Sequence, residues 1–347
     1  MTRIDVTVRG AGIFGMACAW EMQRRGAKVR VIERTGVFSG CSGGLVGALA
    51  PHVPERWNAK KAFQFESLIL AENFWADIAG AAGRDPGYAR SGRLQPVADD
   101  EALVRARERG QEAAVLWQGR AAWNVVRAEE FGNWAPVSPT GWLIHDTLSA
   151  RLHPRQAGAA LLAAFKGAGG EVVIGEGAEE GAVLHATGAA GLADLGAALG
   201  KAVGAPIKGQ AALLRLDRPG APQYLAGGTH GIPHADGTFA IGSTTEREFD
   251  DPSSTDGQID DVVARARAAC PALAEAPVIA RWAGLRPRAR SRAPMLGRWP
   301  GRPGVFVANG GFKIGFGMAP KVAQVMAELI LAGRDVIPEG FRVEDSL

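Results

Sequence analysis

The feature that most constrains the fold is a set of closely spaced glycines near the start of the chain. These glycines form the pattern GxGxxG: Gly10, Gly12 and Gly15. Before them, residues 4–8 form an apolar run typical of a β-strand, and after them residues 13–25 form a helix-compatible segment. A strand, a glycine turn and a helix in this order predict a βαβ unit of the kind that binds a dinucleotide.

Each part of this unit has an expected physical role. Gly10 would make the tight turn, Gly12 would let a pyrophosphate approach the backbone, and Gly15 would let the helix pack closely on the strand. The phosphate would then lie at the positive end of the helix. A second β-run at residues 28–32 ends at Glu33, whose carboxylate is expected to accept hydrogen bonds from ribose hydroxyls.

Composition shows that the bare glycine pattern is weak support by itself. Glycine supplies 47 of the 347 residues, so the pattern is expected about 0.85 times by chance in a chain of this length. The position of the pattern therefore supports the prediction more than the pattern itself does, because it follows one β-run and precedes a second β-run that ends in an acid. The glycines also gather in three stretches, residues 10–47, 167–204 and 301–317. We expect these stretches to lie against the cofactor.

Charge and cysteine content exclude several other classes. The 39 basic and 36 acidic side chains give a net charge of +3, and the basic ones are scattered, so nucleic-acid binding has no support. Cys18, Cys41 and Cys270 form no CxxC pair and predict neither a disulfide framework nor a zinc site. No apolar run reaches the roughly 18 residues of a membrane span and no leader pattern is recognised, so we expect a cytoplasmic protein. A homo-oligomer remains open.

Three later segments favour a flavin over a nicotinamide cofactor. Residues 39–51 are rich in small side chains, so their backbone can lie flat against a ligand, and Ser42 can bond a phosphate. Residues 182–188 are a β-run that ends in Ala-Thr-Gly. Residues 304–320 combine a strand, a glycine loop and the start of a helix expected over residues 318–331. A nicotinamide-dependent dehydrogenase would not need this last segment to return to the first domain.

With these motifs in this order, the chain resembles the D-amino acid oxidase and glycine oxidase family of FAD-dependent oxidoreductases. The resemblance extends over most of the chain and includes Gly-Leu-Arg-Pro at residues 284–287. It implies an α/β (α+β) fold, in which a Rossmann-like FAD-binding domain is interwoven with a substrate domain built on a mixed or antiparallel sheet. The expected FAD-binding domain comprises residues 1–80, 150–205 and 285–347, and the expected substrate-binding domain comprises residues 81–149 and 206–284.

The resemblance also implies where FAD binds. No cysteine or histidine stands where covalently flavinylated relatives attach the cofactor, so non-covalent FAD is expected. Residues 173–183 are shorter than in relatives, so an accessory hairpin is expected to be missing or reduced, which leaves the adenine contacts open. The expected cofactor-binding residues are Gly10, Gly12, Ile13, Phe14, Gly15, Glu33, Arg34, Cys41, Ser42, Gly43, Gly44, Val46, Gly47, Ala48, Val172, Val173, Ala186, Thr187, Gly188, Gly310, Gly311, Phe312, Lys313, Ile314 and Gly315.

The chemistry that the resemblance implies is oxidation of the C–N bond of a small amino acid or amine. Hydride would pass to flavin N5, and the resulting imine would hydrolyse. Arg286 matches the family's carboxylate-binding arginine, and Lys313 stands where arginine is common and could stabilise negative charge on the reduced flavin. His230 stands where a substrate-contacting tyrosine is common. These three are the expected catalytic residues, and the same three with His52 and Thr245 are the expected substrate-binding residues.

Several questions remain open at this level. His230, Lys313 and Gly311 depart from the residues common in relatives, so the substrate is undetermined. Oxygen or another electron acceptor could reoxidise the flavin. A flavin domain acting on a modified nucleoside and a non-catalytic flavin-binding protein remain as alternatives. No metal site is expected, because Gly231 and Pro233 prevent a helix from pairing the nearby histidines.

Overall fold

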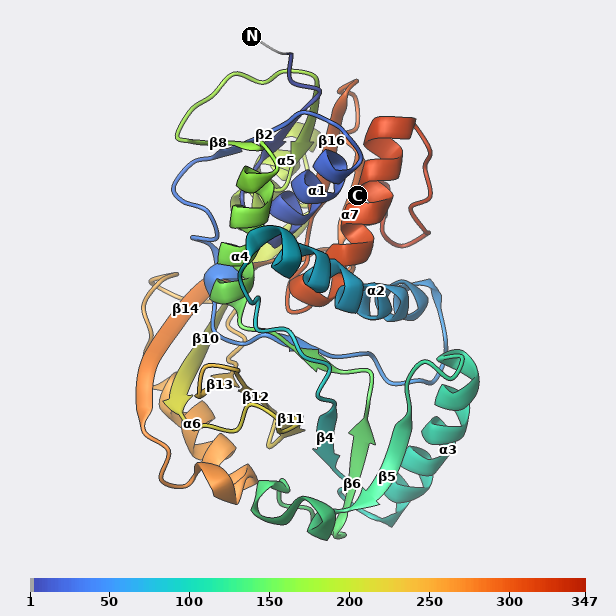
Figure 1. Cartoon of the computed structure of the whole chain (residues 1–347), viewed down its shortest axis with the longest axis vertical. Helices are drawn as coiled ribbons and strands as arrows, with labels where there is room; N and C mark the ends of the chain where they lie inside the picture. Colours follow the sequence, from blue (N-terminus) through green and yellow to red (C-terminus); the bar gives the residue numbers. More distant parts are fainter. Residues whose placement is uncertain (1–2) are drawn as a thin grey trace.

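The computed structural model describes residues 3–347 and contains two large β-sheets, one above the other in Figure 1. The upper sheet has six strands in the order β15-β16-β9-β1-β2-β8. Neighbouring strands are parallel, except that β15 pairs antiparallel with β16. The strands are β1 (Val6–Arg9), β2 (Val29–Glu33), β8 (Glu171–Ile174), β9 (Ala182–His185), β15 (Met295–Arg298) and β16 (Val305–Asn309).

The lower sheet has eight strands in the order β14-β10-β13-β12-β11-β4-β6-β5. It is mixed, because β11 runs parallel to β4 while the other neighbours are antiparallel. The strands are β4 (Arg93–Pro96), β5 (Trp123–Arg127), β6 (Trp142–Asp146), β10 (Gly204–Arg215), β11 (Gln223–Ala226), β12 (Thr229–Pro233), β13 (Thr238–Gly242) and β14 (Val278–Ala289). A short third pair joins β3 (Ala48–Leu49) to β7 (Ala150–Arg151).

Helices cover both faces of the six-stranded sheet, as a parallel sheet requires. Alternate side chains of β16 show this, because Phe306 and Ala308 belong to one apolar core while Val305 and Val307 pack in another. The first core is shared with four helices: α1 (Ile13–Arg24), α2 (Ala59–Ala82), α4 (Pro154–Gly167) and α7 (Gly315–Ala332). The second core lies under α5 (Gly188–Leu199), and the eight-stranded sheet carries α3 (Asp100–Leu116) and α6 (Gln258–Ala269).

The predicted fold class is confirmed by this arrangement and by the βαβ unit of β1, α1 and β2. The last helix begins at Gly315 rather than at residue 318, because its first turn is held by packing, with Gly317 against Leu49 and Leu68. Residues 175–181, all within the described chain, contain no strand, so the accessory hairpin is absent there, as predicted. None of the helices in the described part of the chain is long and apolar enough to cross a membrane.

We keep the division into two domains as a proposal. Every strand of the six-stranded sheet falls in the segments expected for the FAD-binding domain, and β4, β5 and β6 fall in the other. Strand β14 begins in the segments expected for the substrate-binding domain and ends in those expected for the FAD-binding domain, with the boundary between residues 284 and 285. The strand that carries Arg286 therefore spans the place where the two proposed domains meet.

Candidate functional site

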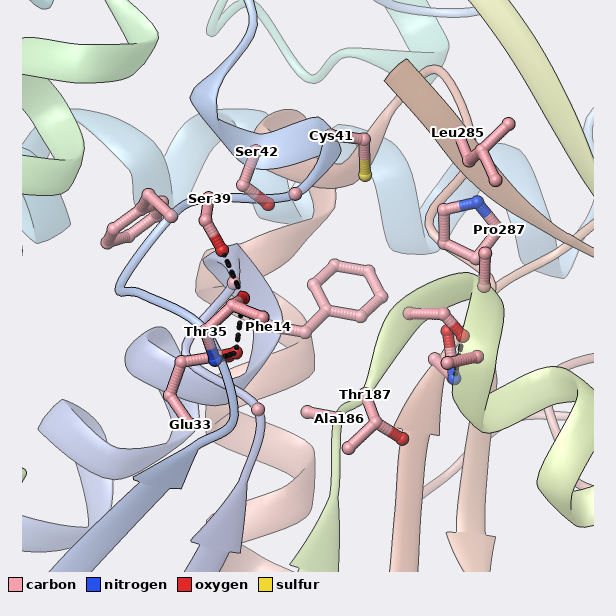
Figure 2. A pocket seen from close by; sticks show the side chains of 18 of the residues that line it. Phe14, Glu33, Thr35, Ser39, Cys41, Ser42, Ala186, Thr187, Leu285 and Pro287 are labelled. Carbon is pink, nitrogen blue, oxygen red and sulfur yellow. Dashed lines mark hydrogen bonds between the residues drawn. The ribbon is translucent and has the colours of Figure 1, made fainter. Parts of the chain in front are cut away.

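A cavity of about 680 Å³ lies at the carboxyl ends of the parallel strands. The chain passes from β1 into α1 on one face of the sheet and from the neighbouring strand β9 into α5 on the other face, and such a switch point is where open α/β sheets bind ligands. The predicted cofactor residues that line the cavity are Gly10, Gly12, Ile13, Phe14, Glu33, Arg34, Cys41, Ser42, Ala186, Thr187, Gly188, Gly311, Phe312 and Gly315. Figure 2 shows six of them, Phe14, Glu33, Cys41, Ser42, Ala186 and Thr187, with Leu285 and Pro287 across the cavity from Ser42.

The other predicted cofactor residues lie outside the lining of this cavity, as far as the described chain defines it. They are Gly15, Gly43, Gly44, Val46, Gly47, Ala48, Val172, Val173, Gly310, Lys313 and Ile314. At the end of the cavity near β8, the lining is made by Gly175 and Glu176, which follow that strand, instead of Val172 and Val173. For the eleven predicted residues outside the lining, contact with the cofactor stays a prediction.

The glycine turn has the geometry that the motif predicts. Gly10 has a φ of +99°, and a Cβ atom there would lie 2.4 Å from the carbonyl oxygen of Ala186. A Cβ atom at Gly15 would lie 1.9 Å from the carbonyl oxygen of Gly10. The turn, the helix and the neighbouring strand end can approach this closely only where side chains are missing.

Ser42 reaches the N-terminus of α1 from a distant loop. Gly12 is the N-cap residue and has no side chain to accept a hydrogen bond. The Oγ atom of Ser42 does so instead, accepting from the backbone N–H of Ile13 at 3.0 Å. Its hydroxyl hydrogen stays available for another acceptor. The site therefore presents a hydroxyl beside the positive end of a helix, which suits a phosphate.

Glu33 lines the cavity and also forms hydrogen bonds to the backbone of the glycine turn. One carboxylate oxygen accepts from the N–H of Ala11 at 2.8 Å, and the other accepts from the N–H of Thr35 at 3.1 Å. Figure 2 shows the contact with Thr35 and its continuation to Ser39. The sequence analysis did not single out Thr35, Ser39 or His185 as cofactor residues, although all three line the cavity. Their positions at or just beyond strand ends are the signal that could have found them.

Four of the predicted substrate residues gather beside β14, above the eight-stranded sheet. Arg286 is only 9% exposed, and its Nη1 donates to the carbonyl oxygen of Thr244 at 3.1 Å. The Nζ of Lys313 donates to Oγ1 of Thr245 at 2.7 Å. His230, on β12, is close enough for the charge of Lys313 to lower its pKa.

No hydrogen bond joins the fifth predicted substrate residue, His52, to these four residues in the described part of the chain, and its contact with a substrate stays a prediction. It is exposed and is tied to α2, because its backbone N–H donates to Oε1 of Gln64 at 2.8 Å and its Nδ1 lies 2.5 Å from the same oxygen. The glycine at position 311, which departs from the residue common in relatives, has a steric explanation. A Cβ atom at Gly311 would lie 2.9 Å from the ring of Phe14. The aromatic ring occupies the space that a side chain at 311 would need.

Electrostatics make this cluster a site for an anion. Burial lowers the pKa of Arg286, and burial followed by the charge of Arg286 lowers the pKa of Lys313. Burial, with smaller contributions from Arg93 and Lys313, lowers the pKa of His230 to about 4, so this ring is neutral at pH 7. Buried Arg286 and the more exposed Lys313 lie close together here, and a negatively charged ligand would relieve the repulsion between these two cations.

The carboxylate that acts on Arg286 is already engaged. Cys41 and Glu246 raise the pKa of Arg286, which opposes the effect of burial. However, its carboxylate lies 3.5 Å from Nζ of Lys208 and accepts a hydrogen bond from Gln210 at 3.1 Å. Because Glu246 is shared with Lys208, it compensates Arg286 only in part. The guanidinium can therefore pair with an incoming carboxylate.

Comparison with known proteins gives a consistent result. A family model described as FAD dependent oxidoreductase (DAO) matches residues 5–329. Glycine oxidase from Pseudomonas aeruginosa is 29% identical, over 96% of this chain and 96% of that protein. The structure of glycine oxidase from Geobacillus kaustophilus superposes with a TM-score of 0.84 at 21% identity, covering 99% of each chain. Iminodiacetate oxidase from a Chelativorans species also gives 0.84, at 23% identity over 97% of this chain and 98% of that one.

Proposed function

Because this chain belongs to the DAO family of FAD-dependent oxidoreductases, we propose that it oxidises the C–N bond of a small amino acid or N-substituted amine. The cavity fits the cofactor. The Gly10 turn, the α1 N-terminus and the Ser42 hydroxyl suit a pyrophosphate, and Glu33 suits a ribose. These backbone and side-chain groups already stand where the cofactor would need them. The observation that carries the proposal is the pair of neighbouring cations, buried Arg286 and the more exposed Lys313, which adjoin the cavity-lining residues Leu285, Pro287 and Phe312 in the sequence.

In this proposal Arg286 binds the substrate carboxylate. A planar guanidinium can form two parallel hydrogen bonds to a carboxylate, which fixes orientation as well as position. Burial strengthens such a pair, since little water competes for it. The bound FAD supplies the oxidising chemistry by accepting the hydride that leaves the substrate α-carbon. The contribution of the protein is then to orient the α-carbon and to bind the amine in its neutral form.

Lys313 and His230 have complementary proposed roles. The Lys313 ammonium, held by Thr245, would stabilise negative charge that develops near the flavin during the reaction. His230 is neutral and offers one donor and one acceptor nitrogen, and its Nδ1 has no hydrogen-bond partner among residues 3–347. A buried, unpaired ring nitrogen can bind the substrate amine or a second polar group of the substrate.

Anaerobic reduction of the bound flavin tests this function. The flavin absorbance near 450 nm should bleach with at least one member of a panel of glycine, sarcosine, iminodiacetate, D-amino acids and L-proline. Iminodiacetate is included because a second carboxylate could pair with the second cation, Lys313. A protein that binds FAD but is reduced by no amine or amino acid would contradict the proposal and favour a non-catalytic flavin-binding protein.

Lys313 gives a prediction for the pH dependence. We expect kcat/KM to rise with pH as the substrate amine loses its proton and then to fall as Lys313 loses its own. Because the Lys313 pKa is lowered by burial and by Arg286, this fall should begin below the ordinary lysine pKa of 10.5. The Lys313→Arg variant stays charged at high pH, so its falling limb should move upward by about 1 pH unit or more. An identical falling limb in both proteins would assign it to another group.

A further inference from the structure

Two histidines and an aspartate meet away from the flavin cavity. His153 stands at the N-terminus of α4, while His234 and Asp236 lie in the turn between β12 and β13. One ligand atom from each residue lies within 4.8 Å of the others. The Nε2 atom of His153 is 3.6 Å from Oδ2 of Asp236. The two histidine rings are 4.4 Å apart between centroids.

The hydrogen bonds of His234 fix its tautomer. Its Nδ1 lies 3.0 Å from Oγ1 of Thr238, and that hydroxyl donates its only hydrogen to Oδ1 of Asp236 at 2.6 Å. Nδ1 must therefore carry the ring hydrogen and donate it to Thr238. The other nitrogen, Nε2, is left as a bare lone pair. A histidine whose far nitrogen is held in this way is prepared to bind a metal ion.

The Nε2 atom of His234 is also buried without a partner. The side chain is 0% exposed, and across the described residues 3–347 no hydrogen bond reaches this nitrogen. A buried acceptor with no donor costs free energy, so an unpaired nitrogen of this kind needs an explanation. A bound cation would supply the missing partner.

His153 and Asp236 can complete a ligand set. Gln156 holds the carboxylate, since its side-chain amide donates to Oδ2 of Asp236 at 3.0 Å. Nδ1 of His153 accepts a long hydrogen bond of 3.4 Å from the backbone N–H of Gln156. To bind a metal through Nε2, His153 must carry its ring hydrogen on Nδ1 instead. This change costs only the long hydrogen bond from the N–H of Gln156.

We propose that His153, His234 and Asp236 bind one divalent transition-metal ion of the Zn²⁺ class. Two imidazole nitrogens and one carboxylate suit zinc better than magnesium or calcium, which prefer oxygen ligands. Three protein ligands leave a fourth position for water, on the side where Asp236 is exposed. The ion would join the start of α4 to the β12–β13 turn, and so connect helices of the flavin-binding core to the eight-stranded sheet.

Equilibrium dialysis of untagged, FAD-loaded protein against Zn²⁺, followed by elemental analysis, tests this site. We expect one Zn²⁺ per chain and a rise in Tm of about 3 °C or more at saturating Zn²⁺. His234→Asn should lose the bound zinc and the rise in Tm. Thr238→Val should lower zinc affinity about 10- to 100-fold, because Thr238 orients His234 without touching the ion, and Thr238→Ser should restore it.

His145→Gln is the matched control, because His145 is a half-buried histidine on β6 outside this cluster. It should bind zinc as the unmodified protein does. Retained flavin absorbance shows that each variant is folded. The proposal fails if the unmodified protein binds no stoichiometric zinc, or if folded His234→Asn binds it equally well.

Discussion

Replacing Arg286 with alanine is expected to lower kcat/KM about 100-fold or more while leaving FAD bound. Arg286 is 9% exposed, and we propose that it pairs with the substrate carboxylate. Removing one partner from a buried, hydrogen-bonded charge pair costs about 2–5 kcal/mol, which corresponds to this loss of rate. Steady-state kinetics with the best substrate of the panel, together with the flavin spectrum of each variant, would measure both quantities.

Two further variants separate charge from geometry. Arg286→Lys keeps the positive charge but loses the planar pair of donors, so we expect an activity between those of Arg286→Ala and the unmodified enzyme. Arg281→Ala is the matched control on the same strand, because Arg281 is exposed and pairs with Asp260 on α6 at 2.5 Å. Its kcat/KM should stay within about twofold, as for most exposed ion pairs. Equal losses in Arg281→Ala and Arg286→Ala would remove Arg286 from the proposed site.

The nucleotide site could be predicted because the elements that form its glycine turn follow one another in the sequence. The roles of Gly10 and Gly15 follow from a strand, a turn and a helix that are adjacent in sequence, so a short pattern contains the geometry. Of the predicted substrate residues, Lys313 is hydrogen-bonded to Thr245, and His52 is hydrogen-bonded to Gln64 on α2. The contact of these three residues with a substrate stays a prediction.

Contacts between distant segments could not be predicted in the same way. The Oγ of Ser42 caps α1 from 29 positions beyond Ile13, and no local pattern states that partnership. His230 and His234 are only four residues apart in the sequence, but Gly231 and Pro233 prevent a helix from pairing them. The structure instead brings His234 to His153, because the β12–β13 turn packs against the start of α4. Such pairs depend on how two sheets are placed, which is a property of the whole fold.

Replacing Gly10 with alanine is expected to abolish stoichiometric FAD binding. The residue has a φ of +99°, which costs a non-glycine residue about 1–3 kcal/mol, and its Cβ would lie 2.4 Å from the carbonyl oxygen of Ala186. Relief of this contact must move the turn or the end of β9, both of which line the cavity. The ratio of flavin to protein absorbance after purification, with Tm measured alongside, would record the loss.

Gly80→Ala separates this effect from a general intolerance of alanine at glycine positions. Gly80 lies inside α2, and a Cβ there would meet no atom within 4 Å. We expect Gly80→Ala to keep its FAD and to gain about 0.5–1 kcal/mol, since alanine is the better helix former. If Gly10→Ala kept one FAD per chain and an unchanged Tm, the close contact with Ala186 would not be needed for the cofactor site. The opposite responses of the two glycines would show that this contact, rather than glycine content, determines FAD binding.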